Sequence, residues 1–206
     1  MIINAAKQVS SDVLKIEAED GPVFFIRYCY LSEISPESIV SGAFFEENME
    51  QELLDAALAF AAENSAASFL ARCEQCRFLL EKKLLKKGHS KTAIKMSLDY
   101  LEESGLLSDY RFSLSWLTGH VISKPQGYNR LYMELLSRGI KPNTAKTALE
   151  EFFNNFNENE LFLRALQKAK KENKSGEKLK KYLFDSGFSA KFLKQIDEDF
   201  TDSMDI

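Results

Sequence analysis

The chain has 206 residues, of which 45% are hydrophobic and 28% charged, a balance typical of a soluble globular protein with one sizeable core or several small ones. With no apolar run long enough to cross a bilayer and no basic-then-apolar N-terminus, we expect a cytoplasmic protein without a membrane span or a secretory signal. The net charge is only −4, and three cysteines, an odd number, argue against a disulfide framework.

The first elements expected along the chain are β-strands. Residues 12–30 are rich in β-formers and alternate, and Glu19-Asp20-Gly21-Pro22 in their midst is a hairpin turn signal. We therefore expect two or three strands. A lone hairpin is marginally stable in water, so it must pack on something else.

The segment that follows is the expected support for this hairpin. Pro36, within the sequence SPES, suits the first turn of a short helix. Phe44 and Phe45 are expected to anchor the segment against the sheet. Together these elements define an N-terminal extension over residues 1–48.

From Glu50 onward the sequence predicts helices only. Apolar residues recur at helical spacing, and Gly or capping residues separate the runs. The expected helices cover residues 53–61, 66–74, 77–87, 92–104, 108–121, 127–138, 143–155, 158–172, 176–186 and 189–200.

One stretch, residues 105–140, has the most detailed local signals. Gly105 is placed to end a helix in the left-handed conformation, and Leu106 and Leu107 are expected to bury the turn. Ser108 or Asp109 can then cap the next helix. That helix has Phe112 and Trp116 at apolar positions, and we favour the core over a contact surface for Trp116. Gly127 breaks the chain before a helix with Leu131 and Leu135 inward, which Gly139 ends.

An internal repeat underlies the helical part. Residues 83–101, 134–152 and 181–200 each have a leucine-rich helix end, a glycine, a short turn and an amphipathic helix, with the glycines at Gly88, Gly139 and Gly187. This predicts three stacked three-helix units in an elongated array. The predicted units are residues 49–107, 108–156 and 157–200, followed by an acidic tail over residues 201–206.

The sequence offers no convincing catalytic constellation, so we expect neither an enzyme nor a cofactor. Cys73-x-x-Cys76 would need two further ligands to hold zinc, and the two histidines, His89 and His120, are far apart in sequence. The two cysteines are better explained as small, semi-buried residues at a helix junction. His89 occupies a slot that is apolar in the other two repeats.

Charge is strongly segregated along the chain. Residues 1–66 carry 3 basic and 12 acidic side chains, whereas residues 161–196 carry 10 basic and 3 acidic ones. Basic residues recur at one helix end in each repeat, a pattern that suits a polyanion or an acidic protein groove. The predicted binding residues are Lys86, Lys87, Arg111, Arg130, Arg138, Lys170, Lys171, Lys174, Lys178 and Lys181.

Simpler explanations exist for several of these residues. Lys86, Lys87 and Arg138 stand where basic side chains complement a helix dipole, which explains them as well as binding does. For Arg111, a bridge to turn carbonyls or to Asp109 is favoured over partner binding. The basic cluster of the third repeat spans a helix end, a loop and the next helix start, so the helix dipole explains it poorly. This third basic cluster consists of Lys168, Lys170, Lys171, Lys174, Lys178, Lys180 and Lys181.

The combination of GLLSDYRF at residues 105–112 and KPQGYNRLYMELLSRGI at residues 124–140 resembles the RecX family of recombinase-regulatory proteins. Residues 69–88 are similar to the opening of that family's first repeat, and residues 13–31 to the strand-rich extension of some members. The chain departs from the pattern at Cys76, where a Ser N-cap is usual, and at His89, where a large aromatic residue is usual.

The resemblance implies a non-enzymatic regulator that lodges in the groove of the RecA–DNA filament, most simply as a monomer, and restrains ATP hydrolysis and strand exchange. Two other functions remain open from the residues themselves. Three-helix units can present a recognition helix to single- or double-stranded DNA directly, and a helical scaffold can serve some other protein partner.

Overall fold

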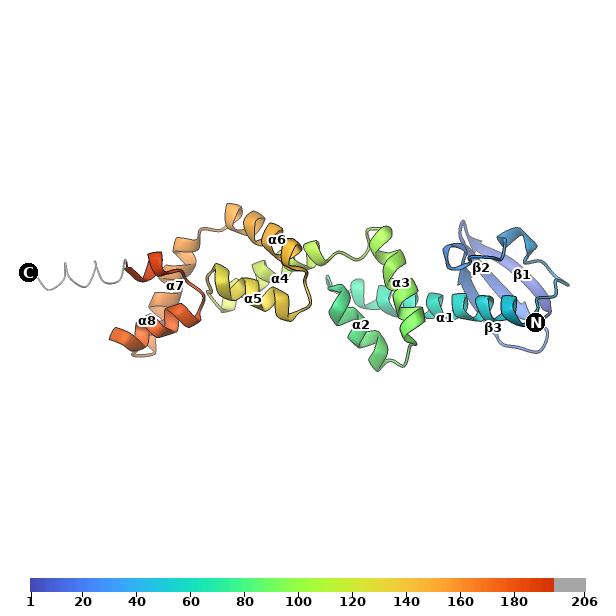
Figure 1. Cartoon of the computed structure of the whole chain (residues 1–206), viewed down its shortest axis with the longest axis horizontal. Helices are drawn as coiled ribbons and strands as arrows, with labels where there is room; N and C mark the ends of the chain where they lie inside the picture. The colour runs from blue at the N-terminus through green and yellow to red at the C-terminus, as the bar shows by residue number, and fades with distance from the viewer. Residues whose placement is uncertain (195–206) are drawn as a thin grey trace, which may run out of the picture. The chain divides into compact units, whose positions relative to one another are not determined.

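The structure, a computed structural model, describes residues 1–194. It is mainly helical with a small N-terminal sheet (Figure 1), which confirms the predicted fold class. The chain folds into two compact units, Met1–Ser108 and a second that begins at Asp109. No helix among residues 1–194 combines the length and the apolar character needed to span a bilayer. The boundaries of the three-helix repeats stay a prediction.

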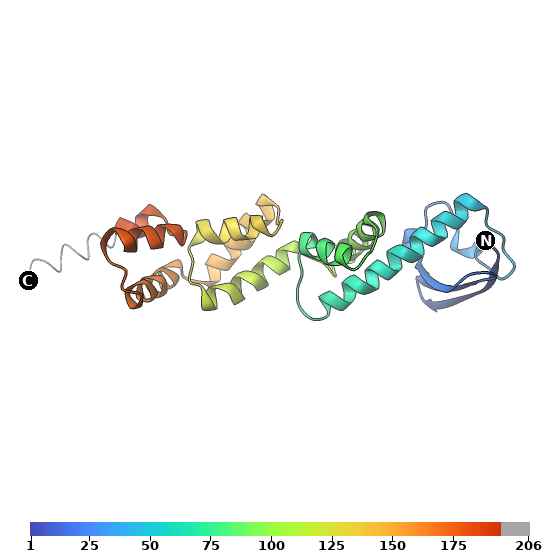
Figure 2. The same cartoon turned by 90° about the horizontal axis from the view of Figure 1, so that it is seen from below.

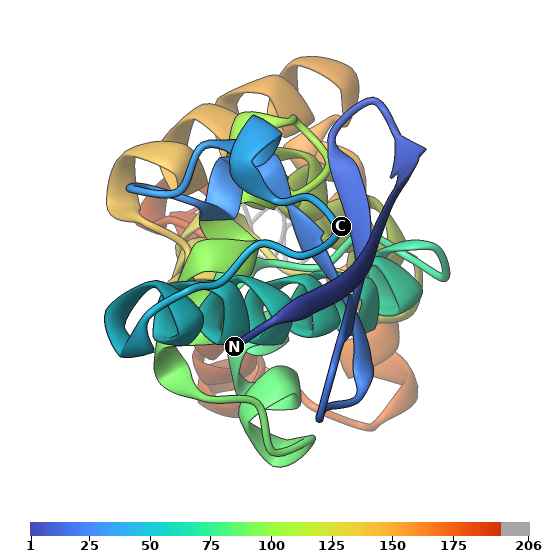
Figure 3. The same ribbon diagram turned by 90° about the vertical axis from the view of Figure 1, so that its right-hand side faces the viewer.

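The N-terminal sheet has three antiparallel strands in the order β1 (Ile3–Ser10), β2 (Val13–Ala18) and β3 (Val23–Arg27) (Figure 3). The turn between β2 and β3 falls at the expected four residues. Strand β1 escaped prediction because its sequence, INAAKQVS, does not alternate and only Ile3 is buried. Its extended conformation depends on pairing with β2, a tertiary contact that outweighs weak local propensity.

The end of the sheet differs from expectation in two places. Tyr28–Tyr30 form a 3-10 turn, η1, instead of continuing the strand, whereas the short helix expected at Pro36 is present as η2 (Pro36–Ser38). Phe45 is buried as predicted, but Phe44 is 68% exposed. Because Phe44 bridges Ile2 in extended backbone, consecutive side chains point to opposite sides and only one can reach the core.

Helix α1 (Glu47–Leu70) is one unbroken helix (Figure 2). The separate helix predicted at residues 66–74 is therefore wrong, since no Gly or Pro interrupts the run before Leu70. The first half of α1 packs on the sheet, and its second half packs on α2 (Arg77–Lys86) and α3 (Lys91–Glu103). Alanines at four buried α1 positions allow this close packing.

The second unit contains the remaining helices, all within about two residues of their predicted ends. In this unit α6 packs against α4 and α5, and α7 packs against α8. Residues 190–194 are helical, while the rest of the helix expected at 189–200 and the acidic tail at 201–206 lie outside the described residues. The bounds are α4 (Asp109–Ser123), α5 (Tyr128–Ser137), α6 (Pro142–Asn155), α7 (Glu158–Lys171) and α8 (Gly176–Asp185).

The glycines predicted to end helices do so. Gly88, Gly105, Gly139 and Gly187 all have φ between 71° and 90°, the left-handed region that glycine enters without a Cβ clash. After Gly105, Leu107 is buried but Leu106 is 56% exposed, which corrects the expectation that both bury the turn. The two residues are consecutive in a tight turn, so only one of them can face the core.

Candidate partner-binding surfaces

The two signature glycines Gly127 and Gly187 meet in the second unit. Gly127 N donates to Ser186 O at 2.9 Å, and Asn129 N donates to Gly187 O at 3.3 Å. A Cβ at position 127 would lie 2.6 Å from Gly187 O, and one at position 187 would collide with the backbone of Arg130. N–H groups at the start of α5, which have no partner within their own helix, thus donate to carbonyl oxygens at the end of α8. We call this contact the glycine joint.

Helix α7 strengthens the same region from two sides. Its first-turn carboxylate, Glu158, accepts a hydrogen bond from Tyr128 N at 3.1 Å. Its Arg164 donates to Val121 O and Ile122 O, at 3.0 and 2.7 Å, and so caps the end of α4. Sequence reasoning missed both residues, because nothing local distinguishes a charged side chain that caps its own helix from one that caps another.

Arg130 and Arg138, both predicted to bind a partner, share one carboxylate in the structure. Glu134 pairs with Arg130 at 2.9 Å and with Arg138 at 2.8 Å. The Arg138 guanidinium also lies 4.1 Å from the centre of the Trp116 ring. Its hydrogen bond to Glu134 holds the pKa of that carboxyl below its ordinary value.

Trp116 is half-buried, between the two outcomes expected for it. It stacks on His120 with ring centres 4.3 Å apart, and the His120 ring in turn contacts Gln126 Oε1 at 2.8 Å. Arg138 covers the indole, so this arginine stabilises α4 against α5 whatever else it contacts.

The third basic cluster stands out on α7 and α8. Five of its lysines are exposed and have no ion pair with any of residues 1–194. Lys174 is different, since it pairs with Glu172 and lies 4.7 Å from the Tyr182 ring. Phe184, on the same helix as two of the lysines, is 65% exposed. The five exposed lysines are Lys168, Lys170, Lys171, Lys178 and Lys181.

The first basic cluster, on α2, is partly occupied by aromatic contacts. Lys83 Nζ donates to Gln75 Oε1 at 2.6 Å and lies 5.2 Å from the Phe69 ring, which Lys87 also approaches at 5.2 Å. Lys86 is exposed, as is Arg111 on the first turn of α4. The cluster is thus a positively charged surface in which two lysine side chains also contact the Phe69 ring.

The pattern Cys73-x-x-Cys76 joins α1 to α2, with Cys73 exposed and Cys76 buried. Among residues 1–194, no group of three or more potential ligands is arranged to hold a metal ion. Both cysteines lie at the predicted helix junction, but neither is semi-buried as predicted, because Cys73 faces solvent and Cys76 is in the core.

A buried polar network in the N-terminal unit was not expected from the sequence. Arg27 donates to both oxygens of Glu63, at 2.9 and 2.5 Å, and also pairs with Asp12. Tyr30 Oη donates to Glu63 at 2.7 Å, and Arg27 stacks 4.3 Å from the Tyr100 ring. Hydrogen bonding to Glu63 raises the pKa of Arg27, and burial with the same carboxylate raises the pKa of Tyr30. The network ties sheet to helix and is structural.

Comparison with known proteins places the chain in a family. No protein-family model matches it. A protein of Treponema pallidum named regulatory protein RecX is 32% identical over 136 residues, which cover 66% of this chain and 83% of that protein. The chain belongs to the RecX family. A regulatory protein RecX of Chlorobium limicola is 30% identical over 95 residues, 44% of this chain and 60% of that protein.

Solved RecX structures share the fold. One titled regulatory protein RecX aligns with a TM-score of 0.74 at 17% identity and covers 96% of this chain and 98% of its own. RecX from Lactobacillus salivarius aligns with a TM-score of 0.58 at 20% identity, over 69% of this chain and 96% of its own. The first alignment covers nearly all of this chain, the N-terminal sheet included.

The two residues that depart from the RecX pattern, Cys76 and His89, occupy the positions predicted for them at a helix start and in a repeat slot. Cys76 takes the extended N-cap conformation of α2 without a side-chain cap bond. His89 is half-buried in its slot, and its Nε2 lies 2.9 Å from Ser65 Oγ of α1. Burial lowers the pKa of His89, and Lys87 adds to the effect.

Proposed function

We propose that this chain is a non-catalytic regulator of the RecA recombinase, in the cytoplasm, that binds the groove of the RecA–DNA filament and restrains ATP hydrolysis and strand exchange. Its membership of the RecX family supports a regulatory role. The main support for the proposed binding surface is the third basic cluster. Five of its lysines are exposed and have no ion pair within residues 1–194. Unpaired surface cations are available to acidic protein surface or to phosphate.

We further propose an order of importance among the predicted binding residues, based on their exposure and contacts. Arg138 and Lys174 are committed to internal partners, whereas Lys170, Lys171, Lys178 and Lys181 are exposed. Arg111 and Arg130 on the exposed surface of the second unit are secondary contacts in this proposal. The glycine joint supports it indirectly, because it fixes α8, which carries Lys178 and Lys181, against α5.

The test is DNA-dependent ATP hydrolysis by RecA with this protein titrated in at moderate salt. We expect inhibition, and we expect K178E/K181E to need at least about tenfold more protein for the same effect, since charge reversal costs binding free energy at each contact. K124E/K146E, which changes two other exposed lysines of the same unit by the same charge, is the matched control. Unchanged ATP turnover at saturating protein would overturn the proposal.

Direct DNA binding is the second candidate function. The same exposed lysines favour it, and it predicts binding to naked single- or double-stranded DNA that weakens steeply as salt rises. If the protein leaves RecA turnover unchanged yet binds naked DNA in this way, the DNA-binding function replaces the first. No binding to naked DNA at low salt excludes it.

A further inference from the structure

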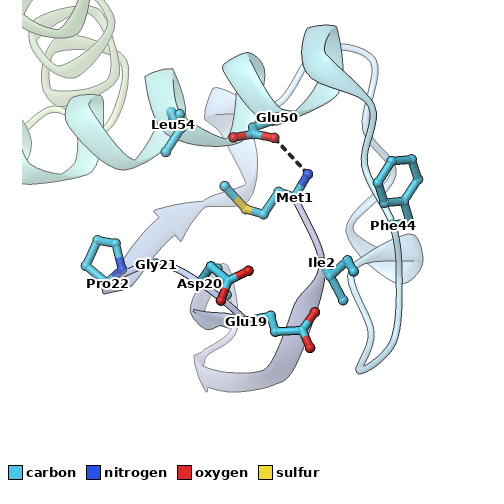
Figure 4. Close-up of a pocket in the computed structure, with 10 residues that line it drawn as sticks. Met1, Ile2, Glu19, Asp20, Gly21, Pro22, Phe44, Glu50 and Leu54 are labelled. Atoms are coloured by element: carbon cyan, nitrogen blue, oxygen red, sulfur yellow. Dashed lines mark hydrogen bonds and ion pairs between the residues drawn. The ribbon is translucent and has the colours of Figure 1, made fainter.

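An open pocket lies in the N-terminal unit, far in sequence from the third basic cluster. It is bounded by the β2–β3 turn, the start of β1, the segment at Phe44 and the first half of α1, and its volume is about 420 Å³ (Figure 4). Its elements all belong to one compact unit, so the pocket is a fixed feature of that unit.

The pocket wall has exposed apolar side chains at two places, Ile2 and Phe44 at one end and Leu54 at the other (Figure 4). Phe44, Ile2 and Leu54 line it with 68%, 43% and 36% of their surfaces exposed. Large apolar side chains that gather at a concave surface are typical of sites that bind another molecule. Phe44, whose exposure the sequence did not predict, is part of this apolar lining.

The rim of the pocket is negatively charged. Glu19 and Asp20, in the β2–β3 turn, are exposed and pair with no residue between 1 and 194. Glu50, on the opposite side in Figure 4, is already matched, since its Oε2 accepts a hydrogen bond from the Met1 amino group at 2.7 Å. Two uncompensated carboxylates thus stand beside an apolar wall.

This chemistry selects the occupant. Nucleic acid is repelled, because residues 1–66 have a net charge of −9 and the rim adds local negative charge. A ligand with an apolar side chain next to a positive charge would contact both the apolar wall and the acidic rim of the pocket. We propose that the pocket binds a segment of a partner protein in which an apolar residue is flanked by Lys or Arg. This second binding site goes beyond the proposed function, which rests on basic surface residues and not on this acidic pocket.

The experiment uses the full chain and two synthetic peptides with the same Leu-Phe centre, one flanked by lysines and the other by glutamates. Binding is measured by calorimetry, and the site is mapped by amide chemical shifts. We expect the lysine peptide to bind and to shift the amides of Ile2, Gly21, Phe44 and Leu54. The glutamate peptide should not bind at the same concentration, because only its charge differs.

Variants locate the interaction. We expect Phe44→Ser and, separately, E19K/D20K to weaken the lysine peptide by at least about tenfold, since one removes the apolar wall and the other reverses the rim. E33K/D55K makes the same change in charge at a different pocket of the same unit and should leave the affinity within about twofold. The altered side chains are exposed except for that of Asp55, which is half-buried, and unchanged thermal midpoints check that the unit stays folded.

Three results would overturn the inference. These are an absence of shifts at the pocket, equal binding of both peptides, or an equal loss in E33K/D55K and E19K/D20K, which would mean attraction to the unit's overall charge. The measurements contain no RecA, so their failure leaves the proposed function untouched. Conversely, failure of the RecA assay leaves the peptide result standing.

Discussion

Glu63 is the residue on which the polar interior of the N-terminal unit depends. Its side chain is 8% exposed and that of Arg27 is 13% exposed, so both charges are largely removed from water. Such a pair stabilises little by itself, but removal of one partner leaves the other charge buried and uncompensated. Here the loss also leaves the Tyr30 hydroxyl without its acceptor.

We therefore expect Glu63→Ala to destabilise the N-terminal unit by about 3 kcal/mol, the effect of breaking a buried ion pair, moderated because Asp12 still pairs with Arg27. Glu17→Ala is the control. It removes the more exposed pair with Lys15 and should cost less than about 1 kcal/mol. Urea unfolding followed by circular dichroism gives both values, and equal midpoints for the two variants would contradict the role assigned to Glu63.

The contribution of Glu134 to folding stability should depend on pH. Arg138 holds the pKa of Glu134 in the folded state below its ordinary value of 4.5. Its contribution to stability is therefore fully present above about pH 4.5 and is lost as the pH falls through the lowered folded-state pKa. Glu134→Gln should accordingly be less stable than the wild type at pH 7, with a difference that shrinks towards zero in stronger acid.

Trp116 is the only tryptophan in the chain and lies against Arg138, so its fluorescence reports this site. Urea unfolding of both proteins, followed by this fluorescence at a series of pH values, tests the prediction. A difference that stays constant from pH 7 down to pH 3 would show that the carboxylate charge contributes nothing.

At the level of elements, the glycine joint decides how α5 and α8 meet. Gly127 has φ −83°, which any residue can adopt, so the demand for glycine comes only from the approach of Gly187 O. Backbone cannot move aside as a flexible side chain can. We expect Gly127→Ala to cost about 1–3 kcal/mol, the usual cost of overpacking.

Gly119→Ala is the matched control, because Gly119 lies inside α4 with nothing within 4 Å of an added Cβ. Alanine there should leave stability unchanged or raise it by up to about 1 kcal/mol, since it favours the helix. Trp116 fluorescence during urea unfolding again supplies the measurement. If Gly127→Ala proved as stable as Gly119→Ala, the two helices could not be in the contact described.

On the scale of the molecule, the two compact units differ in charge. Residues 1–108 carry 11 basic and 17 acidic side chains, a net of −6, whereas residues 109–194 carry 16 and 9, a net of +7. The sign changes within the first unit, because residues 1–66 have a net charge of −9 and residues 67–108 a net charge of +3. In our two proposals, the basic residues of the second unit bind an anionic partner, whereas the N-terminal pocket binds a cationic one.

Because the chain forms two compact units, we expect each unit to unfold in a transition of its own. Glu63→Ala acts in the first unit, and Trp116 reports on the second. Because effects at distant, independent sites do not couple, we expect Glu63→Ala to leave the Trp116 fluorescence transition within about 0.5 kcal/mol of the wild type. An equal shift of the fluorescence transition and the circular dichroism transition would mean that the two units unfold as one.

The sequence by itself determined the family and the limits of the helices from α2 to α8. Helix limits depend on neighbouring residues, on apolar spacing and on a glycine such as Gly105 or Gly139 that can turn the chain, so a local signal suffices. The hairpin turn at residues 19–22 and the burial of Leu107 and Phe112 follow from the same local rules.

Only the tertiary structure decided which of these residues meet. From the sequence, Gly127 and Gly187 were separate turn signals, and Arg138 was a basic residue at a helix end that either complements the dipole or binds a partner. Packing brings each of them to a residue distant in sequence. Strand β1, the burial of Glu63 with Arg27 and the exposure of Phe44 likewise depend on contacts between elements. A residue's own neighbours in sequence carry no information about a partner that lies dozens of positions away, because that contact exists only once the elements have packed.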